Sequence, residues 1–284
     1  MVLRERCFVC GKSTGFYIDD GATLLREARC ENCGASIRNS DLAKAIVNVI
    51  IGRGVSLREG LDQLQGKKIL EAQSCGAINN LLRSVSGFVC FEYFDGVKPG
   101  TDKNGILCND LEALTFRDNS FDLVITQDVL EHVVHPNRAL AEIFRVLKRG
   151  GYHMFTVPLH EGRPTLSRAG LPKVYHGDPL RKEGALVSVD WGDDICSLVD
   201  SYGFNTRRID VHMFYDSCNV TNVDESYSEY LSVHPMKYYR YNSIVFVSQK
   251  KAKGFFGRLV DKFQGDPQKV FGLSGSSAKA KCFM

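Results

Sequence analysis

The sequence predicts an α/β fold with a parallel sheet, preceded by a small cysteine-containing module. Two observations carry this prediction: a strand–helix–strand unit over residues 121–158 and two cysteine pairs near the beginning of the chain. Right-handed crossovers of this kind place the loops that follow each strand along one edge of the sheet, where open α/β sheets bind ligands. The polar residues of those loops are therefore the candidates for function.

The strand–helix–strand unit is read from its apolar spacing. Phe121–Thr126 is a short apolar run typical of a buried strand. An amphipathic helix follows, with Pro136 in its first turn and an expected end at Lys148, Arg149 and the Gly150-Gly151 pair. Tyr152–Val157 is the expected next strand.

The loop after the first of these strands carries ionisable side chains. Asp128 and His132 lie one helical turn apart, and histidine has the pKa for proton transfer near neutrality. A histidine that only packs or caps the loop explains His132 equally well. Glu131 is expected to orient the backbone or a basic residue.

The N-terminal module is defined by its cysteines. Two CxxC pairs, each followed directly by a glycine, supply Cys7, Cys10, Cys30 and Cys33. Four thiolates from two tight turns suit a structural zinc ion in the manner of a zinc ribbon, and leave it no open position for catalysis. A redox dithiol or four unrelated cysteines are the weaker readings. The residues between the pairs have a hairpin-like pattern.

Composition narrows the class of protein. The net charge of +3 shows no general nucleic-acid footprint, so bulk nucleic acid is not an expected partner. No apolar run reaches a membrane-spanning length, and the N-terminus lacks a signal-peptide pattern. The expectation is a cytoplasmic protein without a transmembrane segment. The sequence does not indicate an oligomeric state.

Two motifs give the unit a recognisable identity. Leu130–Val133 (LEHV) and Arg145–Gly151 (RVLKRGG) resemble class I S-adenosylmethionine-dependent methyltransferases of the type 11 kind, and the resemblance extends more weakly over about 66–250. It implies a Rossmann-like, seven-stranded methyltransferase sheet with helices on both faces, whose last strand inserts antiparallel. The expected organisation is a zinc ribbon at 1–36, a helical connector at 37–65, the methyltransferase domain at 66–250 and a flexible basic tail at 251–284.

The resemblance also implies a cofactor site at the ends of the first four strands. Glu71 ends the first strand, Lys67–Glu71, but the glycine-rich turn usual after it is largely missing, and alone this loop reads as an ordinary βα turn. Glu92 follows the second strand, where a carboxylate would hold the ribose hydroxyls. Asp110, at the exit of an expected third strand at 106–111, would accept from the adenine amino group. The residues implied to contact the cofactor are Glu71, Gln73, Ser74, Gly76, Glu92, Tyr93, Asp110, Leu111, Gln127 and Asp128.

A long insertion at Leu159–Leu180 follows the fifth strand, and loops of this length in a compact fold are often functional. His176 within it is a candidate base, so the candidate catalytic residues are His132, His176 and Asp128. The predicted function is methyl transfer from S-adenosylmethionine to a small-molecule or glycan-type acceptor, mainly by positioning. The alternative is an inactive methyltransferase-like module that recruits a partner through its ribbon. A dinucleotide oxidoreductase is disfavoured because no G-x-G-x-x-G follows the first strand.

Overall fold

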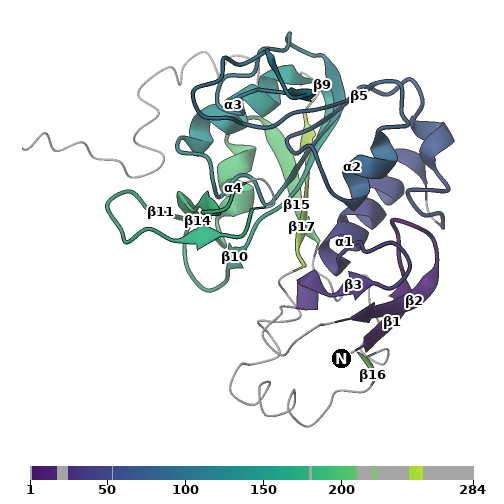
Figure 1. The fold of residues 1–284 in the computed structure, drawn as a ribbon. Coiled ribbons are helices and arrows are strands. Elements are labelled where there is room, and N and C mark those ends of the chain that lie inside the picture. The colour runs from purple at the N-terminus through teal and green to yellow at the C-terminus, as the bar shows by residue number, and fades with distance from the viewer. Residues whose placement is uncertain are drawn as a thin grey trace, which may run out of the picture. The chain divides into compact units, whose positions relative to one another are not determined.

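The computed structural model describes residues 2–17, 25–52, 54–178, 181–209, 220–221 and 243–251 (Figure 1). The chain divides into two compact units, Met1–Ala252 and Lys253–Met284. The second unit lies outside the described residues, as does all but Lys251 of the predicted tail. Among the residues described, no helix is long and apolar enough to cross a bilayer.

A six-stranded mixed sheet forms the centre of the first unit, with the order β15-β17-β9-β8-β4-β5. β4, β5, β8 and β9 are parallel, whereas β17 lies antiparallel between β9 and β15 (Figure 1). The expected antiparallel insertion of the last strand is therefore confirmed. The strands are β4 (Ile69–Glu71), β5 (Phe88–Cys90), β8 (Phe121–Gln127), β9 (Leu147–Thr156), β15 (Phe204–Ile209) and β17 (Val245–Lys250).

The sheet has one strand fewer than the seven expected within the described chain. In place of the strand expected at 106–111, β7 (Ile106–Leu107) pairs antiparallel with β6 (Asp102–Lys103). Contact with the main sheet is reduced to one parallel bridge between Glu92 and Cys108. The short hairpin turns the segment away from the sheet and limits the pairing to this bridge.

Helices cover both faces of the sheet, as predicted. Figure 1 shows α1 and α2 on one side of the strands and α3 and α4 on the other. Successive residues of each strand enter different cores, because side chains alternate across a sheet. Leu123 packs with α1 and α2, whereas Val124 packs with α3 and α4. The helices are α1 (Ile37–Ile46), α2 (Ala77–Leu82), α3 (Pro136–Val146) and α4 (Ile195–Asp200).

The N-terminal module shares a core with the sheet. It consists of β1 (Val2–Arg6), β2 (Ser13–Tyr17) and β3 (Arg29–Cys30), joined by β16 (Val220–Thr221) in one antiparallel sheet. Cys7, Phe16 and Leu42 belong to the same buried cluster as Ile69 and Met154. The hairpin pattern expected between the cysteine pairs falls largely on residues outside the described ranges.

Two predicted helix ends were wrong. Within the predicted helical connector, the pattern SDLAKAIVNVII predicts a capped helix over Ser40–Ile51, but α1 begins earlier because Ser36 caps it: the Ser36 hydroxyl accepts from the Asn39 N–H, and the Asn39 side chain accepts from the Ser36 N–H. The helix continues as a π-helical turn, η2 (Val47–Ile51). α3 ends at Val146 rather than at Gly150-Gly151.

Lys250, from strand β17, donates hydrogen bonds to backbone carbonyls at the C-terminal end of α3. Lys250 Nζ donates to the carbonyls of Phe144 and Leu147, each at 2.7 Å, and to Asn119 Oδ1 at 3.1 Å. Lys148, expected to serve this end, instead pairs with Asp122 at 2.8 Å. The positive charge at the C-terminal end of α3 therefore comes from Lys250 of β17 and not from Lys148, which directly follows the helix.

Short elements complete the described fold. The long insertion contains three short strands, β10, β11 and β12. Strands β10 and β11 both pair with β14 in one small sheet, and β12 pairs with β13 in another. These elements are β10 (Leu159–His160), β11 (Leu166–Ser167), β12 (Tyr175–His176), β13 (Ala185–Leu186), β14 (Val189–Gly192), and the 3-10 turns η1 (Leu25–Glu27) and η3 (Leu61–Leu64).

Candidate functional site

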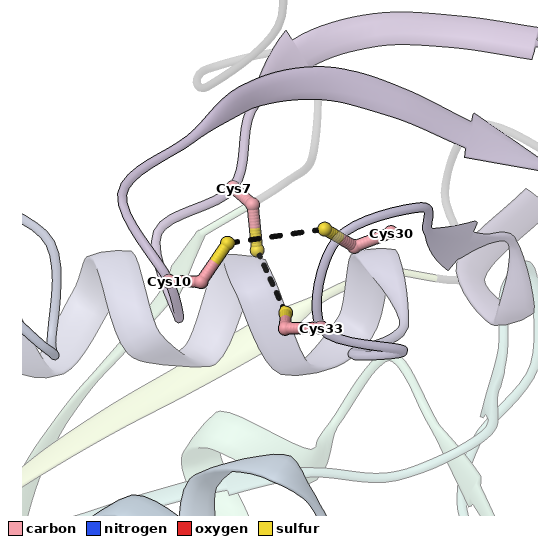
Figure 2. Close-up of side chains that lie close together, drawn as sticks. All are labelled: Cys7, Cys10, Cys30 and Cys33. Carbon is pink, nitrogen blue, oxygen red and sulfur yellow. Dashed lines mark hydrogen bonds between the residues drawn. The ribbon is translucent and has the colours of Figure 1, made fainter.

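The four cysteines of the N-terminal module converge on one point. Figure 2 shows their sulfur atoms directed toward a common centre, and all four lie within 4.8 Å of one another. The Cys7–Cys33 and Cys10–Cys30 sulfur pairs are 3.7 and 3.9 Å apart. Tetrahedral zinc with Zn–S bonds of 2.3 Å requires a sulfur spacing of about 3.8 Å. The spacing expected of a four-cysteine zinc site is therefore present.

The turns that carry these cysteines depend on glycine. Gly11 and Gly34 have φ angles of +83° and +70°, and their N–H groups donate to the carbonyls of Cys7 and Cys30. The thiols also perturb one another: hydrogen bonding to Cys7 lowers the pKa of Cys33 to about 5, while burial raises that of Cys30 to about 11. A bound cation would stabilise the thiolate form of all four cysteines together.

The first loop of the sheet is fixed by side chains. Glu71 is fully buried, and its two carboxylate oxygens accept from Gln127 Nε2 at 2.6 Å and Asn79 Nδ2 at 3.0 Å. Burial raises its pKa to about 8. Asn79 also donates to the Gln73 carbonyl at 2.8 Å, and Arg83 donates to that of Ser74 at 2.8 Å. Glu71 thus organises the loop from within.

Both polar atoms of the Gln127 side chain form hydrogen bonds in the same network. Its amide nitrogen donates to Glu71, and its oxygen accepts from Asn39 Nδ2 of α1 at 2.8 Å. Its side chain therefore holds the sheet to the N-terminal helix, and only its backbone faces the loop region. Gly76 directly precedes α2 as its N-cap residue with φ +107°, and a Cβ there would lie 3.1 Å from the Gln73 side-chain amide nitrogen.

Glu92 and Asp110 lie on neighbouring chain segments at this edge. The Glu92 N–H donates to Leu107, and the Asn109 N–H donates to Glu92, at 3.0 and 2.9 Å. Glu92 Oε1 accepts from the backbone and hydroxyl of Ser74 at 2.7 and 2.9 Å. Burial raises the pKa of Glu92, against the lowering effect of the Ser74 hydrogen bonds. Asp110 Oδ1 accepts from the Glu112 N–H at 2.8 Å.

Tyr93 and Leu111, the predicted cofactor contacts next to Glu92 and Asp110, differ in solvent exposure. Tyr93 is 48% exposed, and its carbonyl accepts from Arg181 at 2.6 Å. Leu111 is buried in the core beneath α3. A surface pocket lined in part by Ile50, Lys67 and Tyr152 lies at the opposite, amino-terminal edge of the strands and does not coincide with this region.

Asp128 is held by two arginines that the sequence did not reveal. Arg26 Nη2 donates to its carboxylate, Arg38 Nε lies 3.3 Å away, and the Thr156 hydroxyl donates at 2.8 Å. Burial opposes ionisation, but the two guanidinium charges outweigh it and hold the pKa of Asp128 well below its usual range. Such a carboxylate is a poor proton acceptor. Its geometry argues against the predicted role as a base and for a role in positioning the loop.

His132 and His176 come together, as their shared prediction as bases requires. Their rings are 5.4 Å apart and nearly perpendicular. The β12–β13 pairing brings His176 from the insertion to the loop after β8, and His132 Nδ1 contacts the Leu186 carbonyl at 2.9 Å. Burial lowers the pKa of both histidines, so both are neutral and able to accept a proton near pH 7.

Glu131 occupies the floor of this cluster. It is 1% exposed, and its Oε1 lies 3.7 Å from His132 Nε2 and 3.9 Å from His176 Nδ1. Burial, followed by the charge of Asp128, raises its pKa well above the usual range. Its carboxylate oxygen therefore faces two histidines.

Comparison with known proteins defines the class of the central segment. Residues 93–155 match the family model described as "Methyltransferase domain". This segment contains β8, α3 and most of β9, and it carries Asp110, Asp128 and His132. The match therefore covers the central segment of the chain, within a fold that has a mixed sheet.

Individual relatives agree with that class. The chain is 37% identical over 103 residues to a ubiquinone/menaquinone biosynthesis C-methyltransferase from Hydrogenovibrio crunogenus, covering 33% of this chain and 40% of the relative. It is 33% identical over 135 residues to phthiotriol/phenolphthiotriol dimycocerosates methyltransferase 1 from Mycobacterium ulcerans, covering 42% and 46%. The chain thus spans less than half the length of these curated relatives. A solved S-adenosylmethionine dependent methyltransferase from Mesorhizobium loti overlaps with a TM-score of 0.40 at 14% identity, covering 66% of this chain and 92% of that one.

Proposed function

We propose that this protein is an S-adenosylmethionine-dependent methyltransferase acting on a small-molecule or glycan-type acceptor. The family match over residues 93–155 and the curated methyltransferase relatives support the reaction class. The observation that carries the cofactor assignment is the juxtaposition of Glu92 and Asp110 at neighbouring strand ends. Two carboxylates so placed can accept from the ribose hydroxyls and from the adenine amino group.

Each residue of the loop has a distinct part in this proposal. Both Ser74 hydrogen bonds end on Glu92 Oε1, so Oε2 is the oxygen offered to a ribose hydroxyl. Gln73, Ser74 and Gly76 would border the methionine part through their backbone. Glu71 and Gln127 would act one step removed, by holding that loop.

The reaction itself asks for alignment and a dry site, since the sulfonium already activates the methyl group. His132 and His176 are the groups that could remove a proton from an acceptor hydroxyl or amine. Both are neutral near pH 7 and lie on the strand-end side of the sheet. The named relatives are methyltransferases of quinone and dimycocerosate biosynthesis, which favours an organic small molecule over a macromolecule as acceptor.

We further propose that Cys7, Cys10, Cys30 and Cys33 bind structural zinc, forming a zinc ribbon. The sulfur spacing, the two glycine turns and a hydrogen bond of 3.3 Å from Asn32 Nδ2 to Cys10 Sγ support this proposal. The ion would supply folding energy to the module.

The cofactor assignment is tested by calorimetric titration of zinc-loaded full-length protein with S-adenosylhomocysteine. We expect saturable binding that Glu92→Gln weakens at least about tenfold, since a hydrogen bond to a charged group contributes about 1.5–3 kcal/mol. Glutamine retains the oxygen that accepts from Ser74, so the loop should stay in place. Asp62→Asn, an exposed change in η3, is the matched control and should bind as the wild type does. Folded protein that shows no binding at millimolar ligand would contradict the proposal.

A second candidate, an inactive methyltransferase-like binding module, is favoured by one observation. The loop after β4 has few glycines and is closed by internal hydrogen bonds from Asn79 and Arg83. The same titration separates the two: an intact, zinc-loaded protein that ignores the cofactor would be such a module.

A further inference from the structure

Three potential metal ligands meet at the carboxyl end of β8, away from the cysteines. They belong to Glu131, His132 and His176, and one ligand atom from each lies within 4.8 Å of the other two. The carboxylate oxygen is 3.7 Å from one imidazole nitrogen and 3.9 Å from the other. Ligands bound at 2.0–2.1 Å to one ion stand roughly 3.0–3.4 Å apart. A small inward rotation of the two half-exposed histidines would close this difference.

The carboxylate lacks the partners that its burial demands. Glu131 is 1% exposed, and neither Oε1 nor Oε2 accepts a hydrogen bond from another described residue. An acceptor of this kind, taken out of water without a donor, is costly unless it binds a proton or a cation. It is also the group toward which both imidazoles are directed.

The tautomer of His132 sharpens the point. Its Nδ1 lies 2.9 Å from the Leu186 carbonyl, which can only accept, so Nδ1 carries the hydrogen. The neutral ring then presents a lone pair at Nε2, facing the carboxylate oxygen of Glu131. Two acceptors facing each other require something positive between them. Metal-binding histidines commonly donate their other N–H to a backbone carbonyl in this way.

We propose that Glu131, His132 and His176 bind a divalent transition-metal ion through one carboxylate oxygen and two imidazole nitrogens. The donor set suits zinc, iron(II), cobalt, nickel or manganese, and disfavours calcium and magnesium, which prefer oxygen ligands alone. The site shares no residue with the four cysteines, so the protein holds two chemically different metal sites.

The surrounding charges tolerate such an ion. Arg26 and Arg38 contribute two positive charges nearby, Asp128 and Glu27 contribute two negative ones, and Glu131 would add a third on giving up its proton to the ion. With only three protein ligands, at least one coordination position stays open for water or another oxygen. Resting on the proposed function, that position would receive an acceptor oxygen and lower its pKa for methylation.

The site is tested with full-length protein supplied with a single equivalent of zinc, which the four thiolates bind in preference to the mixed nitrogen and oxygen site, and then titrated with cobalt(II) chloride. Cobalt bound by nitrogen and oxygen absorbs in the visible range, without the sulfur-to-cobalt charge-transfer band that displacement of zinc from the cysteines would add. We expect one equivalent of cobalt to bind without that band. Glu131→Gln, which keeps the shape of the side chain, and His176→Ala should each weaken binding tenfold or more.

His135→Ala is the matched control, because this histidine lies on the same loop but hydrogen-bonds to Glu112 at 2.7 Å. It should leave cobalt binding unchanged, and tryptophan fluorescence would verify that each variant is folded. The proposal is overturned if cobalt binds only with the charge-transfer band, does not bind at millimolar concentration, or binds regardless of both ligand substitutions. Titration of the same preparations with S-adenosylhomocysteine keeps the outcomes separate: cofactor binding without cobalt binding rejects the metal site alone, and the reverse rejects the proposed methyltransferase function alone.

Discussion

Asp128→Asn removes one charge from the point where the N-terminal segment meets the end of β8. Asp128 pairs with Arg26, whose side chain is 4% exposed, and lies 3.3 Å from Arg38. Asparagine is close in shape and tolerates the left-handed φ of +51° that Asp128 adopts. The substitution therefore isolates the charge, and we expect it to destabilise the protein.

The expected loss in the free energy of unfolding depends on how well the two arginines remain paired after Asp128 is replaced. Removing one partner of a buried ion pair costs about 3–5 kcal/mol. Asp128 is 21% exposed, and Glu27 remains within 3.3 Å of both arginines. Asparagine also keeps one acceptor oxygen. We therefore expect a loss of about 2–3 kcal/mol in the free energy of unfolding.

The assay is urea unfolding followed by the fluorescence of Trp191, the single tryptophan, which is fully buried. The folded-state pKa of Asp128 is depressed, so its contribution is present above the unfolded pKa of about 3.9 and is lost as pH falls through the folded value. The difference between wild type and variant should thus be constant near neutrality and shrink below about pH 4.

Two results would refute this reasoning. One is a loss below about 0.5 kcal/mol near neutral pH, the range of ordinary surface substitutions. The other is a double-mutant cycle with Arg26→Met that shows no coupling, where we expect more than about 1 kcal/mol. Asp118→Asn is the control, because this 68% exposed partner of Arg145 should change stability by less than about 1 kcal/mol.

The remaining predictions concern one helix end and the zinc site. Lys250→Met keeps the aliphatic stem but removes the donor to the Phe144 and Leu147 carbonyls at the end of α3, and should lower the free energy of unfolding by about 2–3 kcal/mol in urea titrations; an unchanged midpoint would show that water replaces the ammonium group. Cys33→Ser should lower the zinc content, measured by mass spectrometry of the purified protein, by one equivalent and reduce the melting temperature, whereas Cys90→Ser should do neither. Equal zinc content in both variants would remove the cysteine cluster as the binding site.

Much of the fold was accessible from the sequence because it follows from local patterns. The apolar run at Phe121 predicted β8, and the helical spacing after Pro136 predicted α3. The antiparallel last strand was implied by the family resemblance and is present as β17. The cysteine spacing likewise predicted a cluster that depends on two short turns.

What failed depended on contacts between distant segments. No local signal indicates that Lys250 caps α3, because the residues involved are separated by about a hundred positions. The same holds for Arg26 and Asp128, which turn a candidate base into one half of an ion pair. The approach of His176 to Glu131 was not predictable for a related reason: the pairing of β12 with β13 brings the two side chains together. The cofactor residues remain predictions.

The buried cluster that runs from Cys7 to Met154 has a consequence for how the polypeptide can be divided. A fragment starting at residue 66 would uncover the apolar side chains of β9 and β17 that α1 now covers, and would leave the Gln127 oxygen without Asn39. The first fifty residues thus cover one apolar face of the central sheet and form part of its core. Removal of the N-terminal module should therefore destabilise the central sheet as well as delete the cysteine cluster.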